Sequence, residues 1–404
     1  MAFDSLRGWS SAQKHVVAAS YLGWTLDAFD FFLLVFVIKD VAGEFGTAVS
    51  DIALAVTLTL ALRPVGAFVF GRLADRFGRR PILMLDVALY SVLGFATAFA
   101  PNLTAFLVIR ALFGVAMGGE WGIGASLTME TVKPEARGFV SGLLQSGYPS
   151  GYLIASVAYG LLYAHIGWRG MFMIGILPAV LILYIRRNVP ESPGWDRERA
   201  SAATIVNVLA RHWQLALYAI LLMTAFNFFS HGTQDLYPTF LQKQHHFDHT
   251  TVSTIAVLYN VGAILGGLSF GALSQSLGRR RTMIVAALLA LPAIWLWAYS
   301  ETATLLAVGA FLVQFFVQGA WGVVPAHLNE LSPAEARGTF PGTVYQLGNF
   351  IASSNAVLQA RIAENHNNNY SLALAGVAVT AALAVALLAW LGREARDIDM
   401  AKAR

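Results

Sequence analysis

The sequence contains no cysteine and few charged residues. The absence of cysteine from all 404 residues excludes disulfide bonds and thiol chemistry. Charged residues make up 12% of the chain, whereas they are about a quarter of an average soluble protein. Hydrophobic residues make up 57%, and the mean hydropathy is +0.60. Lipid is therefore the expected solvent for most of this chain.

Motifs for enzymatic chemistry are missing as well. The chain has no Walker loop, dinucleotide fingerprint, nucleophile elbow or cluster of metal ligands at the usual spacing. His245 and His246 lie in a predicted loop, and we interpret them as solvated side chains. We therefore expect no enzymatic activity, no cofactor and no bound metal. The first residues also lack a signal-peptide pattern, so the first apolar segment is expected to be retained.

What the chain does contain is a series of apolar runs, each long enough to cross a bilayer. A crossing helix needs roughly 20 apolar residues. The runs predict an all-α membrane protein with twelve transmembrane helices. We expect these helices near 16–38, 51–71, 81–100, 103–127, 138–162, 168–187, 214–241, 251–273, 282–300, 303–327, 338–360 and 370–391.

The basic residues are distributed unequally between the two sides of this predicted topology. One side carries only Lys39, Arg169, Lys243 and Arg361, and two arginines lie inside predicted helices. The rest of the 27 Lys and Arg residues fall on the side of both termini. By the positive-inside rule, both termini are expected in the cytoplasm, with the chain in the inner, or plasma, membrane. The net charge of +4 then reflects topology, and we expect no nucleic-acid partner.

The two halves of the chain repeat each other at a shift of 200 residues. The shift pairs Gly71, Gly78 and Arg79 with their counterparts 200 positions later, and it also pairs Trp121 and Arg137 with theirs. One offset at two separate motifs predicts two pseudo-symmetric six-helix bundles with a substrate site between them. The expected division is a first bundle at 1–187, a cytoplasmic linker at 188–213 and a second bundle at 214–404.

The segment GRLADRFGRRP at 71–81 matches the loop signature of the major facilitator superfamily, and GALSQSLGRRR at 271–281 is its weaker copy. This resemblance covers nearly the whole chain and implies the major facilitator fold. In the second copy Gln275 replaces the acid, so we expect that half to latch weakly. A charge network is expected to latch the cytoplasmic face when the protein opens outward. Its expected gating residues are Asp75, Arg79, Arg80, Glu130 and Arg137.

Few ionisable residues fall inside the predicted helices, and each needs a partner or a function at that depth. Arg63 lies near the middle of the second helix, and its planar guanidinium can hold a carboxylate with two parallel hydrogen bonds. It is the expected substrate anchor, and a permanent ion pair with Asp27 or Asp30 is the alternative. Glu120 is a further buried acid, and a purely structural role for it is equally compatible with the sequence.

His231 and Asp235 are four residues apart on the seventh predicted helix. This spacing places them on one helical face, where they can share or relay a proton. A structural pair near the outer end of the helix is the alternative. The pair is the expected site of proton coupling, and Asp27, Asp30 and Glu120 are the alternative proton carriers.

The seventh helix, NFFSHGTQDLYPT at 227–239, resembles the signature of yeast-type lactate/pyruvate:proton symporters of the sialate:proton symporter family. LDAFDFFLLVF at 26–36, GGEWGIGAS at 118–126 and VPESP at 189–193 are similar to the same family. The resemblance implies functional roles for Ser230 and Thr239, and it places other polar residues on the substrate path. The expected substrate-binding set is Arg63, Gln145, Asn227, His231, Gln234, Gln346 and Asn349.

The residues and the resemblance together predict a secondary transporter that works by alternating access. The expected partners are a proton, a small carboxylate such as lactate or pyruvate, and membrane lipid. A symporter of a larger acid, sialic or aromatic, is the alternative within transport. A membrane sensor that keeps the fold without transport is the alternative from another class. By analogy with the family we expect a monomer.

Overall fold

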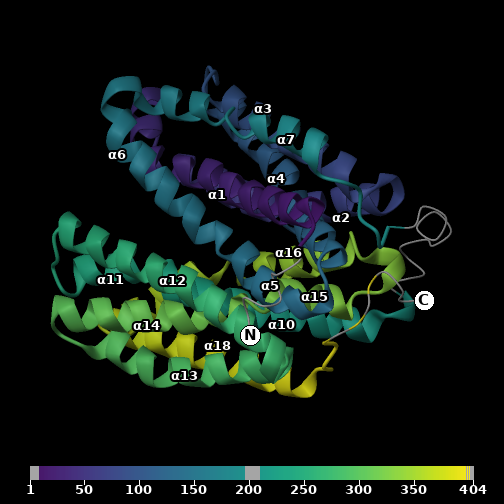
Figure 1. The fold of residues 1–404 in the computed structure, drawn as a ribbon. Helices are drawn as coiled ribbons and strands as arrows, with labels where there is room; N and C mark the ends of the chain where they lie inside the picture. Colours follow the sequence, from purple (N-terminus) through teal and green to yellow (C-terminus); the bar gives the residue numbers. More distant parts are fainter. Residues whose placement is uncertain (1–8, 196–209, 397, 399, 401–404) are drawn as a thin grey trace.

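The computed structural model describes residues 9–195, 210–396, 398 and 400, and every regular element within them is a helix (Figure 1). Nine helical stretches are long and apolar enough to cross a membrane by themselves, and a bent pair adds a tenth among the described residues. The bent pair contains the fifth and sixth predicted ranges, and the eleventh range coincides with two shorter helices, Phe340–Ala352 and Asn355–Asn365. Each of the twelve predicted ranges coincides with one continuous or broken helix. The predicted all-α, multi-pass membrane fold is confirmed.

The first group of helices is built from the first half of the chain. Gly167 has a φ of 61° inside α6 and breaks that helix, so its last turns join α7 in the sixth crossing. The group comprises α1 (Ser11–Phe45), α2 (Val49–Phe77), α3 (Arg79–Thr97), α4 (Leu103–Thr131), the 3₁₀ turn η2 (Pro134–Ala136), α5 (Arg137–Gln145), α6 (Gly147–Ile174) and α7 (Ala179–Asn188).

The second group repeats this arrangement with more breaks. Its seventh, tenth and eleventh crossings are each divided into two helices. The group comprises α10 (Trp213–Gln234), α11 (Tyr237–Lys243), α12 (His249–Leu277), α13 (Arg279–Tyr299), α14 (Ala303–Trp321), α15 (Val324–Leu331), the 3₁₀ turn η3 (Ala334–Ala336), α16 (Phe340–Ala352), α17 (Asn355–Asn365) and α18 (Tyr370–Leu391). The predicted linker at 188–213 falls partly outside the described residues, so the division into two domains at that segment stays a prediction.

The signature segments, expected to form loops, are almost entirely helical. Only Gly78, with a φ of 109°, separates α2 from α3, and Gly278, with a φ of 93°, does the same between α12 and α13. A positive φ lets the chain reverse within one residue. The Glu191 carboxylate caps α3 by accepting from the backbone N–H groups of Arg79 and Arg80 at 2.8 and 3.2 Å. These caps replace the hydrogen bonds that a longer loop would otherwise supply.

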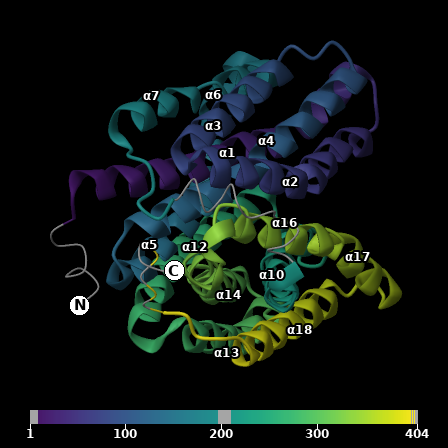
Figure 2. The same ribbon diagram turned by 90° about the vertical axis from the view of Figure 1, so that its right-hand side faces the viewer.

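The second copy of the signature is capped by the C-terminal segment. The backbone N–H groups of Arg279 and Arg280 donate to the Glu394 carboxylate at 3.2 and 3.1 Å. The first and last described residues, Trp9 and Met400, pack in one apolar cluster on this side of the molecule, where α5 also lies (Figure 2). We call this side the terminal face.

The two groups of helices meet near the terminal face and lie apart at the opposite end (Figure 1). Glycines bring the backbones together at this contact. A Cβ atom at Gly122 would stand 2.8 Å from the Gly342 Cα, and one at Gly138 would stand 2.6 Å from the carbonyl oxygen of Gly271. Such spacing leaves no room for a side chain between the helices.

Within the first group, a face of small residues on α4 packs on α2. A Cβ atom at Gly114 would stand 2.7 Å from the Thr59 Cα, and one at Gly118 would overlap the carbonyl oxygen of Arg63. The glycines therefore fix the depth and position of the helix that carries Arg63.

Replacing Gly118 with alanine should destabilise the protein, because the added methyl group meets backbone that cannot move aside. Overpacking of this kind costs about 1–3 kcal/mol. Gly160→Ala is the matched control, since nothing lies within 4 Å of a Cβ atom there. Thermal unfolding in detergent should show a melting temperature lowered by several degrees for Gly118→Ala alone. Equal melting temperatures for the two variants would contradict this packing.

Candidate functional site

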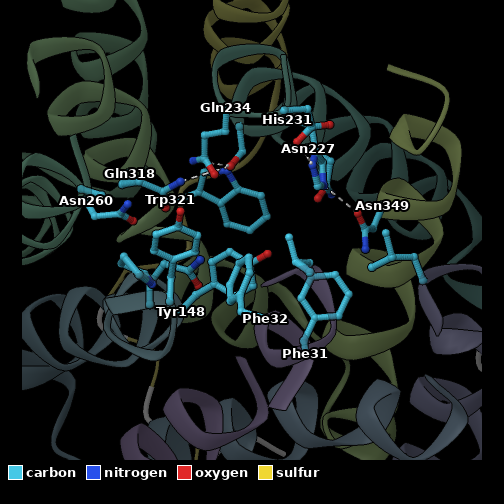
Figure 3. A pocket seen from close by; sticks show the side chains of 18 of the residues that line it. Phe31, Phe32, Tyr148, Asn227, His231, Gln234, Asn260, Gln318, Trp321 and Asn349 are labelled. Atoms are coloured by element: carbon cyan, nitrogen blue, oxygen red, sulfur yellow. Dashed lines mark hydrogen bonds and ion pairs between the residues drawn. The ribbon is translucent and has the colours of Figure 1, made fainter. Parts of the chain in front are cut away.

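A cavity of about 380 Å³ lies between the two groups of helices, midway along their length. Aromatic and neutral polar side chains dominate its wall, together with one arginine and one His–Asp pair. Figure 3 shows Phe31, Phe32 and Tyr148 of the first group opposite His231, Gln234 and Trp321 of the second. The lining also includes Trp24, Val35, Val56, Leu60, Arg63, Gln145, Pro149, Tyr152, Asn227, Ser230, Asp235, Pro238, Tyr259, Asn260, Ala263, Gln318, Tyr345 and Asn349.

Arg63 lies in the wall of the cavity on α2 and is 2% exposed. Its guanidinium is 5.2 Å from the Phe31 ring centroid, and its Nη2 donates to the Met117 sulfur at 2.6 Å. Within the described part of the chain, no ion pair joins it to Asp27 or Asp30, although Asp27 is near enough to interact electrostatically. A cation with only a sulfur and a ring as close partners can still accept a carboxylate.

The predicted pair on the seventh helix is in contact and faces the cavity. His231 Nδ1 lies 3.1 Å from Asp235 Oδ1, and the side chains are 27% and 32% exposed. His231 Nε2 lies 3.0 Å from Asn349 Oδ1 on α16. One imidazole therefore joins an acid on its own helix to an amide on another, so a proton on the ring changes contacts on both.

Several residues of the expected binding set line the cavity, and one does not. Gln145 is in the wall, where its Oε1 accepts from Trp121 Nε1 at 3.3 Å, and Asn227 donates to the Met223 carbonyl at 2.7 Å. Gln346 is buried outside the lining, and it accepts from Asn349 at 3.3 Å. Thr239, given a role by the family resemblance, is also outside the lining.

A network of neutral hydrogen bonds on the second group was missed by the sequence analysis. Gln234 donates to Gln314 at 2.8 Å, and Gln318 donates to Ser230 at 3.1 Å. Gln314 in turn donates to Thr233 at 2.9 Å. Two glutamines four residues apart in the apolar run FLVQFFVQGAW lie on one face of α14, and that spacing could have indicated a buried polar contact.

The acids proposed as alternative proton carriers lie away from the cavity. Asp27, Asp30 and Glu120 are at most 2% exposed and are absent from its lining. None of their carboxyl oxygens has a hydrogen-bond partner among the described residues. They lie inside the first group of helices, with Asp86 and Tyr90 of α3, which the sequence analysis also missed.

The expected gating acid closes the terminal face by bonding to the other half. The Asp75 carboxylate accepts from the backbone N–H groups of Gly338 and Thr339 at 2.8 and 3.0 Å. Arg79 Nη1 lies 2.9 Å from Asp75 and Arg79 Nη2 lies 3.3 Å from Glu130. We call these contacts the seam. Because the seam lies between the cavity and the terminal face, this state is closed on that face.

Of the remaining expected gating residues, Arg137 contacts the other half, whereas Arg80 bonds within the first half. Arg137 lies 3.9 Å from Glu330, and Arg337 lies 3.8 Å from Glu130, so each pair crosses the boundary. Arg80 donates to the Arg186 carbonyl at 2.5 Å and stays within its own half. The gating role expected for Arg80 stays a prediction.

The second copy of the signature makes the same contact without a charge. The Gln275 Oε1 accepts from the Gly138 N–H at 3.2 Å. This bond is the counterpart of the bond between Asp75 and Gly338, because both residues have their equivalents 200 positions away. Bonds that involve an ionised group are about twice as strong as neutral ones. The side chain of Gln275 is neutral, although it also accepts from Arg279 at 3.1 Å, and weaker latching by this half stays a prediction.

The fold and the cavity between two helical halves are those of a secondary transporter, and comparison with known proteins identifies the family. A sequence profile of the Major Facilitator Superfamily matches residues 21–240, and one described as "Sugar (and other) transporter" matches residues 215–395. The chain belongs to the Major Facilitator Superfamily.

Similar proteins include a probable 4-methylmuconolactone transporter of Cupriavidus pinatubonensis, 30% identical over 88% of this chain and 85% of that protein. A carboxylic acid transporter protein homolog of Saccharomyces cerevisiae is 28% identical over 86% of this chain, which spans 61% of that protein's length. A crystal structure of a double-tryptophan mutant of XylE has a TM-score of 0.76 at 18% identity, covering 97% of this chain and 98% of that one. The last likeness concerns the fold alone.

Replacing Asp75 with asparagine should weaken the seam, because the neutral amide loses the ion pair with Arg79. A coupling of 1–3 kcal/mol would shift the closed population about 5- to 150-fold. The chain's lack of cysteine allows spin labels at Arg76→Cys and Ser276→Cys, two exposed positions on opposite halves. We expect a longer label–label distance to gain population, and transport to slow while substrate affinity is kept.

Gln275→Ala is the control for this experiment. It removes a contact across the boundary that carries no charge, together with one bond from Arg279 within its own half, so its shift in the distance distribution should be smaller than that of Asp75→Asn. Loss of substrate binding in a folded Asp75→Asn protein, or equal shifts in the two variants, would contradict a latch that acts through charge.

Proposed function

We propose that this protein is a proton-coupled symporter of an organic monocarboxylate that works by alternating access. The observation that carries the proposal is the composition of the cavity wall, where Arg63 is the one arginine or lysine in the described lining. A monoanion needs one fixed cation for its carboxylate and neutral donors for its other oxygens. Gln145, Asn227 and Asn349 supply such donors. The names of the similar proteins, which include a carboxylic acid transporter homolog, favour the same class of substrate.

The size and lining of the cavity bear on which acid is carried. Lactate and pyruvate, suggested by the helix 7 signature, are three-carbon acids that would occupy a small part of 380 Å³. Flat rings around the cavity, among them Phe31, Phe32, Tyr148 and Trp321, instead offer stacking partners for a planar or ring-bearing acid. The geometry therefore favours the larger acid, and the name of the muconolactone transporter agrees with this preference.

An uptake screen in proteoliposomes decides between the two substrate classes. Radiolabelled 4-hydroxybenzoate, L-lactate, pyruvate and sialate would be tested with and without an inward proton gradient, with protein-free vesicles subtracted. We expect saturable, gradient-dependent uptake of 4-hydroxybenzoate, and weaker competition by lactate. Counterflow in the same vesicles tests the sensor alternative, because a sensor would exchange no substrate.

We place the chain in the inner membrane with both termini in the cytoplasm. The support is the excess of lysine and arginine in the loops on the terminal face. With this orientation the seam closes the cytoplasmic side, and the state described is outward-facing. The proton and the substrate would then enter from the side opposite the termini.

Replacing Arg63 with lysine should remove most substrate binding even though the charge is kept. A lysine ammonium is a point charge and cannot make the two parallel hydrogen bonds that a guanidinium makes to a carboxylate. Loss of one charge-assisted bond of about 1.5–3 kcal/mol weakens binding roughly 10- to 150-fold. Binding to purified protein by calorimetry is the measurement, with Met117→Leu as the control that removes only the sulfur contact. Near-wild-type affinity for Arg63→Lys would remove this residue from the anchor role.

Replacing Asp235 with asparagine should remove the proton coupling that depends on His231, so accumulation driven by a proton gradient falls while exchange between preloaded vesicles continues. An unperturbed imidazole changes charge between pH 5 and 8, and Asp235 is the acid that stabilises the charged ring of His231. Each proton carried with a monoanion gives about tenfold accumulation per pH unit. Both assays should be made on one preparation at two pH values. Full gradient-driven accumulation by the variant would move the coupling site away from α10.

A further inference from the structure

A second group of ionisable side chains lies behind the cavity wall, in the interior of the first half. Asp27 of α1, Asp86 of α3 and Glu120 of α4 are each 0% exposed. None of the three belongs to the cavity lining. We call these three residues the inner acid cluster.

Two glycines leave the space that these carboxyl groups occupy. A Cβ atom at Gly119, the neighbour of Glu120, would stand 2.8 Å from Asp86 Oδ1. A Cβ atom at Gly23, one turn before Asp27 on α1, would overlap Glu120 Oε1. The carboxyl of Glu120 therefore lies against α1 and that of Asp86 against α4, and both acids are near enough to Asp27 to interact with it electrostatically.

The polar groups of this region lack hydrogen-bond partners. Both carboxyl oxygens of each acid in the cluster are unpaired within the described residues. The hydroxyl groups of Tyr90, one turn after Asp86 on the same face of α3, and of Ser20 on α1 are also buried and unpaired in that part of the chain. Ser20 borders the carboxyl of Glu120, because a Cβ atom at Gly124 would lie 3.7 Å from Ser20 Oγ and 3.5 Å from Glu120 Oε1. Unpaired hydroxyl groups therefore lie beside unpaired carboxyl groups in this buried region.

The charges around the cluster show which of its members can be ionised. Asp27 interacts electrostatically with Arg63 and Arg110, whereas the charged neighbours of Asp86 and Glu120 are other acids. The titratable and charged groups that face the cluster are Asp30 of α1, Arg63 of α2, Tyr90 of α3 and Arg110 of α4. Two ionised carboxylates at this depth without a cation would be costly, so we expect at least one of Asp86 and Glu120 to hold a proton.

We propose that Asp86 and Glu120 form a second proton-binding site, which exchanges protons with the cavity through Asp27 beside Arg63. A proton taken from water in the cavity passes to the Asp27 carboxylate and then to Glu120 or Asp86, where it converts an anion to a neutral acid. Its release on the other side restores the anion. The proposal deepens the proposed function and rests on it, because it adds a second proton to the transport cycle.

The same helices connect this site to the closure of the terminal face. Asp86 and Arg79 lie two turns apart on α3, while Glu120 and Glu130 lie on α4. Arg79 and Glu130 are partners in the seam. A change of charge at the acids therefore acts on the two helices that hold the seam closed. A sodium ion fits the site less well, since no group of three or more His, Cys, Asp or Glu residues in the described chain is arranged to hold a metal.

The stoichiometry makes the proposal measurable. One proton with one monoanion moves no net charge, whereas two protons with one monoanion move one positive charge per cycle. A membrane potential of 100 mV, negative inside, then drives about 50-fold accumulation without a pH gradient. The probes are radiolabelled 4-hydroxybenzoate and L-lactate in proteoliposomes, with a potassium diffusion potential set by valinomycin and protein-free vesicles subtracted.

The variants Asp86→Asn and Glu120→Gln keep the size of each side chain and remove its proton. We expect them to lose accumulation driven by the potential, to keep about tenfold accumulation per pH unit, and to keep counterflow. Glu120→Asp should recover part of the response to potential. Ser91→Ala is the matched control, since it removes a buried, uncharged group next to Tyr90. Counterflow shows that each variant is folded. If one of the two variants shows no counterflow, the other variant is used for the test.

Three results would overturn the proposal. Wild-type accumulation that ignores the potential but follows the pH gradient would leave the proposed function intact and exclude a second proton. A response to potential that survives in both variants would place the second proton elsewhere. Accumulation driven by a sodium gradient and lost in Glu120→Gln would make the site a sodium site. Absence of any gradient-driven uptake by the wild type is a separate outcome, because it rejects the proposed function itself.

Discussion

The contact between the two halves at the terminal face is the constraint on which the rest of the structure depends. The Asp75 carboxylate accepts hydrogen bonds from two backbone N–H groups that precede α16 in the other half. A carboxylate at the start of a helix is stabilised by the partial positive charge of that end. The contact therefore holds α2, which carries Arg63, against α16, which carries Asn349. Closure of one face and the shape of the cavity follow from the same few hydrogen bonds.

Much of the architecture could be predicted from the sequence because the bilayer leaves the backbone few choices. Every crossing must satisfy its own hydrogen bonds, so length and hydropathy are sufficient to place the helices. The breaks could not be predicted in this way. The reversal at Gly78 depends on a cap from Glu191, which is 113 positions away in the chain. Contacts between such distant residues leave no periodic signal in the sequence.

The candidate site was predictable where its residues are out of place in lipid. Arg63, His231 and Asp235 stand out because charge is rare in a membrane helix, and all three reach the cavity. Phe31, Tyr148 and Gln318 could not be distinguished, since rings and isolated amides also occur where helices pack on each other. The position of Glu120 and Gln346 along their helices was misleading. A polar residue in the middle of a helix can face the cavity or the interior of its own half, and the sequence does not distinguish the two.

The positions of the acids divide the molecule into two chemically different compartments. In the second half, His231 and Asp235 face the cavity and are half-shielded, so water and substrate can reach them directly. In the first half, Asp86 and Glu120 are enclosed by helices and can change charge only if a proton passes through the protein. Arg63 stands at the boundary, in contact with the cavity and near Asp27. A carboxylate bound at Arg63 would weaken the hold of this guanidinium on Asp27, and the negative charge of a substrate would then favour a proton on that acid. In the proposed symport, binding of an anion and uptake of a proton would thereby be linked through one side chain, with no need for the two ligands to touch.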